Sequence, residues 1–132
     1  MTNSIVGNSA AVDILVVESD TDFSDRLRSL FESAGFTAVV DTGHGDLLDL
    51  VDTHDPRCLV ISHELPSGSG IDLLKSIRAK GADTATIIVS DNGEVEHAVA
   101  AIRAGAVDFI EKPFTEARLL QAVRNACKTS YD

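Results

Sequence analysis

Residues with carboxylate, hydroxyl or ammonium side chains follow four apolar runs of this sequence, where each run gives way to a turn. Carboxylate oxygens are the ligands that hard cations such as Mg²⁺ favour, and a serine hydroxyl becomes a nucleophile when a base lies beside it. Each of these residues, taken alone, fits a solvated loop position equally well. The set comprises Glu18, Ser19, Asp20, Ser62, Ser90, Asp91 and Lys112.

The apolar runs that these residues follow alternate with helical patterns along the chain. Runs rich in Val, Ile and Leu predict short buried strands at 14–17, 37–40, 58–61, 86–89 and 107–110. Apolar residues spaced three and four apart predict five helices, one after each strand. Because the strands are apolar throughout instead of alternating, we expect helices on both faces of an open, doubly wound parallel sheet.

In such an α/β sheet, ligands and chemistry collect beyond the carboxyl ends of the strands. All of the polar residues in the set are predicted to lie at that edge. Their grouping at one edge favours a shared site over a series of unrelated loop residues.

Four segments of the sequence resemble the receiver domain of response regulators in two-component signalling. The segments are ILVVESD, SHELPSGSG, TIIVS and AGAVDFIEKPF, and their spacings agree with that family over essentially the whole chain. The resemblance implies a flavodoxin-like fold with five helices and a five-stranded sheet in the order 2-1-3-4-5. We expect this receiver-like domain to cover residues 13–130, after a polar lead-in at 1–12.

The resemblance also implies roles for individual positions. An aspartate at the position of Ser62 accepts a phosphoryl group from a histidine kinase in that family, and two acids matching Glu18 and Ser19 help to hold Mg²⁺. A Ser or Thr matching Ser90 and a lysine matching Lys112, which precedes Pro113, bind the phosphoryl oxygens. An aromatic residue that matches Phe109 changes rotamer when the switch is thrown.

This sequence departs from the family at two of these positions. Ser62 and Ser19 replace carboxylates, while Glu18 remains and Asp20 lies one residue further along. We therefore expect weak or no Mg²⁺ binding, no cofactor and no metal site. Ser62 is also a poor nucleophile without a base, and His63 is predicted to point to the opposite face of the strand.

Lys112 needs a new partner if residue 62 carries no charge. An ammonium group beside apolar strand ends is costly unless a carboxylate lies close to it. We expect Glu18 to be that partner, with a contribution from Asp20. In this arrangement the loop after the fifth strand, and with it Phe109, is held in one state.

Composition limits the function further. The 132 residues include 11 Lys and Arg against 21 Asp and Glu, a net charge of −10 that disfavours direct binding of nucleic acid. No apolar run is long enough for a membrane span and no signal peptide is evident, so we expect a cytoplasmic protein. Cys58 and Cys127 are predicted to be core residues, because no CxxC pair is present.

The sequence thus predicts a non-enzymatic signalling module that acts by protein–protein interaction. The expected partners are a histidine kinase or an output protein, or a second copy bound through the fourth helix, fifth strand and fifth helix. One alternative is a phosphorylated response regulator with altered acceptor chemistry, in which another donor modifies Ser62 or a nearby residue. Another is a small flavodoxin-like nucleotide-binding protein, although no glycine-rich phosphate loop follows the first strand.

Overall fold

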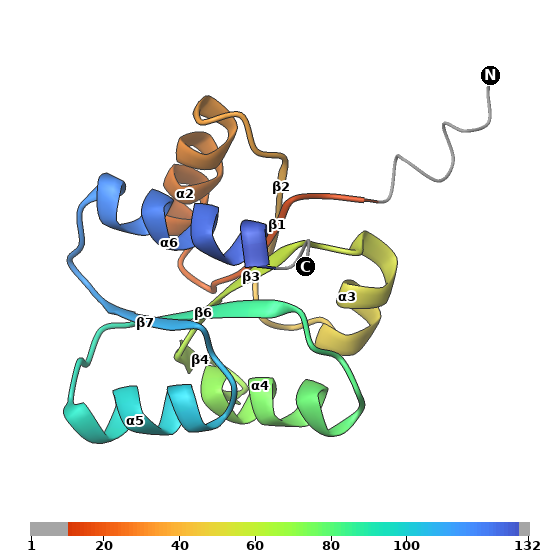
Figure 1. Ribbon diagram of the computed structural model, residues 1–132, viewed down its shortest axis with the longest axis vertical. Helices are drawn as coiled ribbons and strands as arrows, with labels where there is room; N and C mark the ends of the chain where they lie inside the picture. Colours follow the sequence, from red (N-terminus) through yellow and green to blue (C-terminus); the bar gives the residue numbers. More distant parts are fainter. Residues whose placement is uncertain (1–10, 130–132) are drawn as a thin grey trace.

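The computed structural model describes residues 11–129, which form a parallel sheet with helices on both faces (Figure 1). The sheet order is β2-β1-β3-β6-β7, which confirms the predicted order 2-1-3-4-5. The predicted lead-in at 1–12 lies almost entirely outside the described residues, as does residue 130. The strands of this sheet are β1 (Ile14–Val17), β2 (Ala38–Asp41), β3 (Cys58–Ser62), β6 (Ala85–Ser90) and β7 (Asp108–Glu111).

Five helices connect and cover these strands. On one face lie α2 (Thr21–Ser33) and α6 (Glu116–Thr129), and on the other lie α3 (Leu47–His54), α4 (Gly70–Ala79) and α5 (Val95–Arg103) (Figure 1). No helix within residues 11–129 is long and apolar enough to cross a membrane.

Side-chain alternation along the buried strands divides the core into two layers. On β1, Ile14 and Val16 pack towards α2 and α6, whereas Leu15 and Val17 pack towards α3 and α4. Both layers are apolar, which explains why β1, β3 and β6 have continuous apolar runs instead of alternating patterns.

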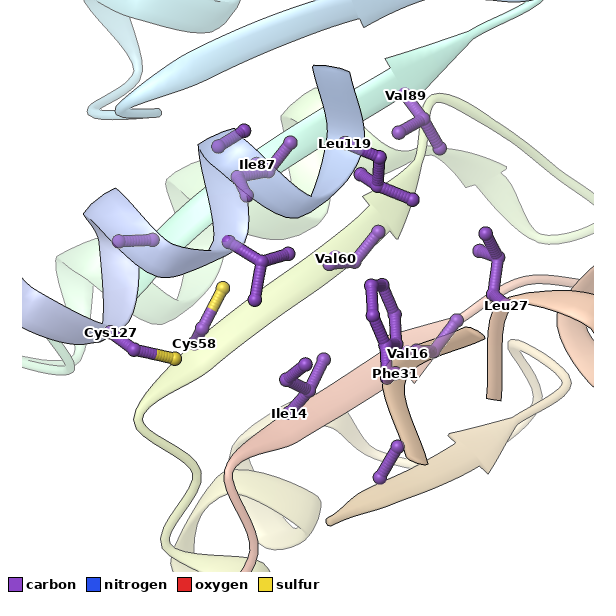
Figure 2. Close-up of a cluster of buried hydrophobic side chains, with 14 of the residues drawn as sticks. Ile14, Val16, Leu27, Phe31, Cys58, Val60, Ile87, Val89, Leu119 and Cys127 are labelled. Atoms are coloured by element: carbon purple, nitrogen blue, oxygen red, sulfur yellow. The ribbon is translucent and has the colours of Figure 1, made fainter. Parts of the chain in front are cut away.

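The two cysteines belong to the core layer under α6. Cys58 at the start of β3 and Cys127 near the end of α6 lie side by side with unbonded sulfurs (Figure 2). A hydrogen bond with Cys127, together with burial, raises the pKa of the Cys58 thiol well above its usual value. The Cys58 thiol is therefore uncharged at neutral pH, and both cysteines are buried core residues, as predicted.

A hairpin between β3 and α4 was not predicted from the sequence. Two short strands, β4 (Glu64–Leu65) and β5 (Gly68–Ser69), pair antiparallel around the turn that contains Pro66. These strands have two residues each, too short for a periodic signal, and the Pro, Ser and Gly residues around them favour a loop. This hairpin lies directly after Ser62 and therefore shapes the candidate site.

Candidate functional site

Glu18 is the buried acid of the site. It directly follows β1, and only 3% of its surface is exposed. One carboxylate oxygen, Oε1, lies 3.2 Å from the Nζ atom of Lys112, and the other accepts a hydrogen bond of 3.0 Å from the backbone N–H of Asp20. The predicted pair between Glu18 and Lys112 is confirmed.

The second acid beside Lys112 differs from the prediction. The Lys112 ammonium lies 3.5 Å from Oδ1 of Asp91 and 4.2 Å from the centre of the Phe23 ring. Asp20, which was expected to contribute here, instead caps α2, because its Oδ1 accepts a hydrogen bond of 3.1 Å from the N–H of Phe23. Lys112 is thus enclosed by two carboxylates and an aromatic ring.

Ser62 ends β3 and is 1% exposed. Its hydroxyl donates a long hydrogen bond of 3.4 Å to the backbone oxygen of Glu64. The neighbouring His63 does not serve as its base, as predicted, because its Nδ1 lies 3.2 Å from Oγ of Ser69. Ser62 is therefore a buried hydroxyl without an activating group among the residues that the structure describes.

Ser90 ends β6 and is fully buried. Its hydroxyl donates a hydrogen bond of 2.7 Å to Oε2 of Glu64, and the N–H of Asp91 donates one of 3.0 Å to Oε1 of the same carboxylate. Burial acts to raise the pKa of Glu64, but these two hydrogen bonds, together with the nearby His63, lower it below its ordinary value. Glu64 is thus held ionised at neutral pH.

The remaining predicted residues lie around this centre. Phe109 of β7 is half-buried against the core layer that contains α5. Pro113 is exposed, and together with Phe23, Lys112 and Phe114 it lines a hollow at the edge of the site. Ser19 is half-buried beside Glu18 and has no assigned role.

The site does not suit the Mg²⁺ ion that the fold family implies. Both oxygens of Glu18 are already engaged, one by Lys112 and one by a backbone N–H. Ser19 and Ser62 offer neutral hydroxyls where a hard cation favours carboxylates. Within residues 11–129, no three His, Cys, Asp or Glu side chains are arranged to hold a metal ion.

Sequence reasoning missed two contributors to the site, Glu64 and Phe23. Glu64 lies two residues after Ser62, and a strand continued past Ser62 would place both side chains on the same face. That spacing was the available signal, but the turn residues that follow concealed it. Phe23 reads as part of the apolar stripe of α2, so only the tertiary structure reveals its contact with Lys112.

Comparison with known proteins identifies a family and several relatives that resemble this chain. Residues 14–124 match the family described as "Response regulator receiver domain". The chain is 36% identical over 114 residues to the transcriptional regulatory protein FixJ of Azorhizobium caulinodans, covering 86% of this chain and 54% of FixJ. It is 34% identical over 115 residues to the response regulator protein TodT of Pseudomonas putida, covering 87% of this chain and 51% of TodT.

Solved structures agree with these sequence matches. Full-length FixJ from B. japonicum superposes with a TM-score of 0.82 at 33% identity, covering 90% of this chain and 59% of that one. The receiver domain of the Francisella response regulator 1452 gives a TM-score of 0.84 at 27% identity, covering 90% of this chain and 98% of that one. The chain spans about half the length of the curated relatives it matches.

Proposed function

Because the chain belongs to the response regulator receiver domain family, we propose that it is a signalling receiver that acts through protein contacts and takes up no phosphoryl group at residue 62. The observation that carries this proposal is the buried Ser62, whose hydroxyl hydrogen-bonds to a backbone oxygen. An aspartate is ionised at neutral pH, whereas a serine hydroxyl needs an adjacent base to attack phosphorus. We propose that the domain has no enzymatic activity.

The charges of the pocket support the same proposal. The carboxylates of Glu18 and Asp91 both lie beside the Lys112 ammonium, and Glu64 adds a third carboxylate next to Ser90 and Asp91. A phosphoryl donor is itself anionic, so this surplus of negative charge disfavours its approach unless a cation is bound. Since Glu18 is already paired with Lys112, it is poorly placed to recruit such a cation.

The nucleotide-binding alternative has less support. A nucleotide phosphate would use the free N–H groups at the N-terminus of a helix after the first strand. Asp20 caps α2 with its own carboxylate, and a second negative charge at this position disfavours a phosphate.

Receiver domains interact with kinases and output domains, and we propose partners of both kinds for this chain. The match covers only about half of its relatives FixJ and TodT, which supports an output partner on the same or another chain. We further propose a homodimer through α5, β7 and α6. The outer surface of α5 supports it, because Val95, Val99 and Ile102 are 77%, 42% and 53% exposed at helical spacing.

A phosphorylation assay with a restored acceptor tests the proposal. The protein is incubated with acetyl phosphate and Mg²⁺, and its intact mass is measured alongside the double variant Ser19→Asp, Ser62→Asp. We expect no mass change for the native protein and the addition of one phosphoryl group to the variant, which shows that the donor is competent. A stoichiometric, Mg²⁺-dependent phosphoryl group on the native protein would overturn the proposal.

A further inference from the structure

Two hydrogen-bond donors on consecutive residues converge on a single carboxylate beside Ser62. The Ser90 hydroxyl lies 2.7 Å from one oxygen of Glu64, and the Asp91 N–H lies 3.0 Å from the other. Hydroxyl and backbone N–H groups that converge in this way form a site for an oxyanion, whether its oxygens belong to a carboxylate or to a phosphate. The site is therefore filled by a group of the protein itself.

The hairpin after β3 holds Glu64 in place. Glu64 pairs with Ser69 across the β4–β5 ladder, and its backbone oxygen accepts the hydrogen bond from Ser62. Next to it, the N–H of His63 donates a hydrogen bond of 2.8 Å to the carbonyl oxygen of Val89 in the adjacent strand. Because the backbone on both sides is fixed, the carboxylate reaches the donor pair at a small cost in conformational entropy.

Ser90 connects this carboxylate to the loop that leads into α5. Its Oγ also accepts a hydrogen bond of 3.0 Å from the N–H of Asn92, and the Asn92 side chain in turn accepts one of 3.1 Å from the N–H of Glu94. α5 begins at the next residue, Val95, which is 77% exposed. The group that occupies the oxyanion site therefore influences where the start of α5, and with it the exposed apolar surface of this helix, lies.

We propose that Glu64 is a built-in ligand of the Ser90–Asp91 oxyanion site. Its carboxylate occupies the donors that a free oxyanion would need, and it holds Ser90 and the loop before α5 in one arrangement without any phosphoryl group. The inference rests on the proposed function in one respect, namely that residue 62 carries no phosphoryl group to compete for these donors. The Glu64 carboxylate thus holds the receiver domain in one conformational state.

Removing the carboxylate and supplying a free one tests this proposal. The Glu64→Ala variant is compared with the native protein and with Glu94→Ala, a matched control in the same region whose carboxylate makes no capping hydrogen bond. The backbone amide signals of Ser90, Asp91 and Asn92 are followed by NMR during titration with sodium acetate and, separately, with inorganic phosphate. Chloride at equal ionic strength corrects for general salt effects.

In Glu64→Ala we expect the Asp91 amide proton to move upfield and its hydrogen exchange to accelerate by about tenfold or more, because a charge-assisted hydrogen bond is lost. Acetate should then reverse the upfield shift in a saturable way. The native protein and Glu94→Ala should show neither response. If acetate fails and phosphate alone restores the signal, the site prefers phosphate over the carboxylate class, and the proposal is overturned.

An Asp91 amide signal that is unchanged in Glu64→Ala, or an acetate response of equal size in the native protein, would also overturn it. If Glu64→Ala proves poorly folded, Glu64→Gln retains one acceptor oxygen and should show a smaller shift of the same sign; no shift in that variant counts against the proposal. Phosphoryl uptake by the native protein in the mass assay would refute the proposed function alone, whereas an unresponsive Asp91 amide would refute this inference alone.

Discussion

Single charged residues hold the carboxyl edge of the sheet together. Lys112 links the end of β1 to the loop after β7 through Glu18, and to the loop after β6 through Asp91. Glu18 is 3% exposed, so its charge depends on the ammonium and on the N–H of Asp20 for compensation. The contribution of the Glu18–Lys112 pair to the free energy of unfolding is therefore set by the penalty for leaving a buried carboxylate without its cation.

Lys112→Met should destabilise the fold by about 1–3 kcal/mol, because it leaves the Glu18 carboxylate buried and short of a partner. In a Glu18→Gln background the same change should cost clearly less, since no charge is then left uncompensated. A double-mutant cycle based on urea unfolding measures this coupling. Additive effects of the two substitutions would show that the ion pair contributes nothing of its own.

Glu64 gives stability a dependence on acidic pH. Its pKa in the folded protein is lower than the ordinary value of 4.5, so its stabilising effect is complete above about pH 4.5 and is lost as the pH falls through the folded value. We expect a difference of at most about 1 kcal/mol between the native protein and Glu64→Gln at neutral pH, because the side chain is exposed. Urea unfolding at neutral pH and at about pH 3.5 should show that difference shrinking. A constant difference across this range contradicts the assignment.

Sequence reasoning identified the Glu18–Lys112 pair because both residues end or follow strands whose order the fold class fixes. The second acid near Lys112 differed from the prediction, because Asp20 caps α2 and its carboxylate satisfies the free N–H of Phe23. The contact between Glu64 and Ser90 joins residues 26 positions apart through a hairpin too short to predict. Local patterns thus located the edge of the sheet, while the choice of partners within it depended on side-chain geometry.

The connection between β3 and α4 is tightly constrained by its backbone contacts. Gly70 begins α4 at a point where an added Cβ atom would overlap the backbone oxygen of Ser62. Its N–H also donates a hydrogen bond of 2.8 Å to the carbonyl oxygen of His63. The helix start and the end of the strand are therefore in direct backbone contact, and the hairpin between them has little freedom.

Gly70→Ala should cost about 1–3 kcal/mol, because the methyl group must displace backbone atoms. Gly81→Ala, at a left-handed position with open space around it, serves as the control. Both variants should lower stability in thermal unfolding, but only Gly70→Ala should shift the amide signals of Ser62 and Glu64. Equal shifts at these residues in the two variants would argue against a local backbone clash.

The exposed surface of α5 is the surface that we propose for partner binding. Val99→Glu should weaken self-association or partner binding while changing stability by less than about 0.5 kcal/mol, because Val99 already faces solvent. Sedimentation velocity over a range of concentrations measures the association. Ser29→Glu adds the same charge on the exposed side of α2 and should leave association unchanged. Association that persists in Val99→Glu would rule out this surface of α5.

On the scale of the whole molecule, the sheet brings residues from four strand ends to one edge, as the alternation of strands and helices predicts. The fold follows from the sequence because continuous apolar strands admit few arrangements other than a sheet covered on both faces. The net charge of −10 is compatible with a module that recognises proteins instead of nucleic acid. The family fold is present, and we propose that Ser19 and Ser62 stand in its pocket where the family resemblance implies carboxylates.

The most direct test of this account is the amide NMR spectrum of the native protein, recorded first with millimolar Mg²⁺ and then with acetyl phosphate added. A pocket that binds no metal and carries no acceptor should leave the signals of Glu18, Ser62, Ser90, Asp91 and Lys112 where they are at each step. Saturable shifts at these residues with Mg²⁺, followed by a second set of signals with acetyl phosphate, would contradict the account. Such a result would mean that the pocket still performs phosphoryl chemistry.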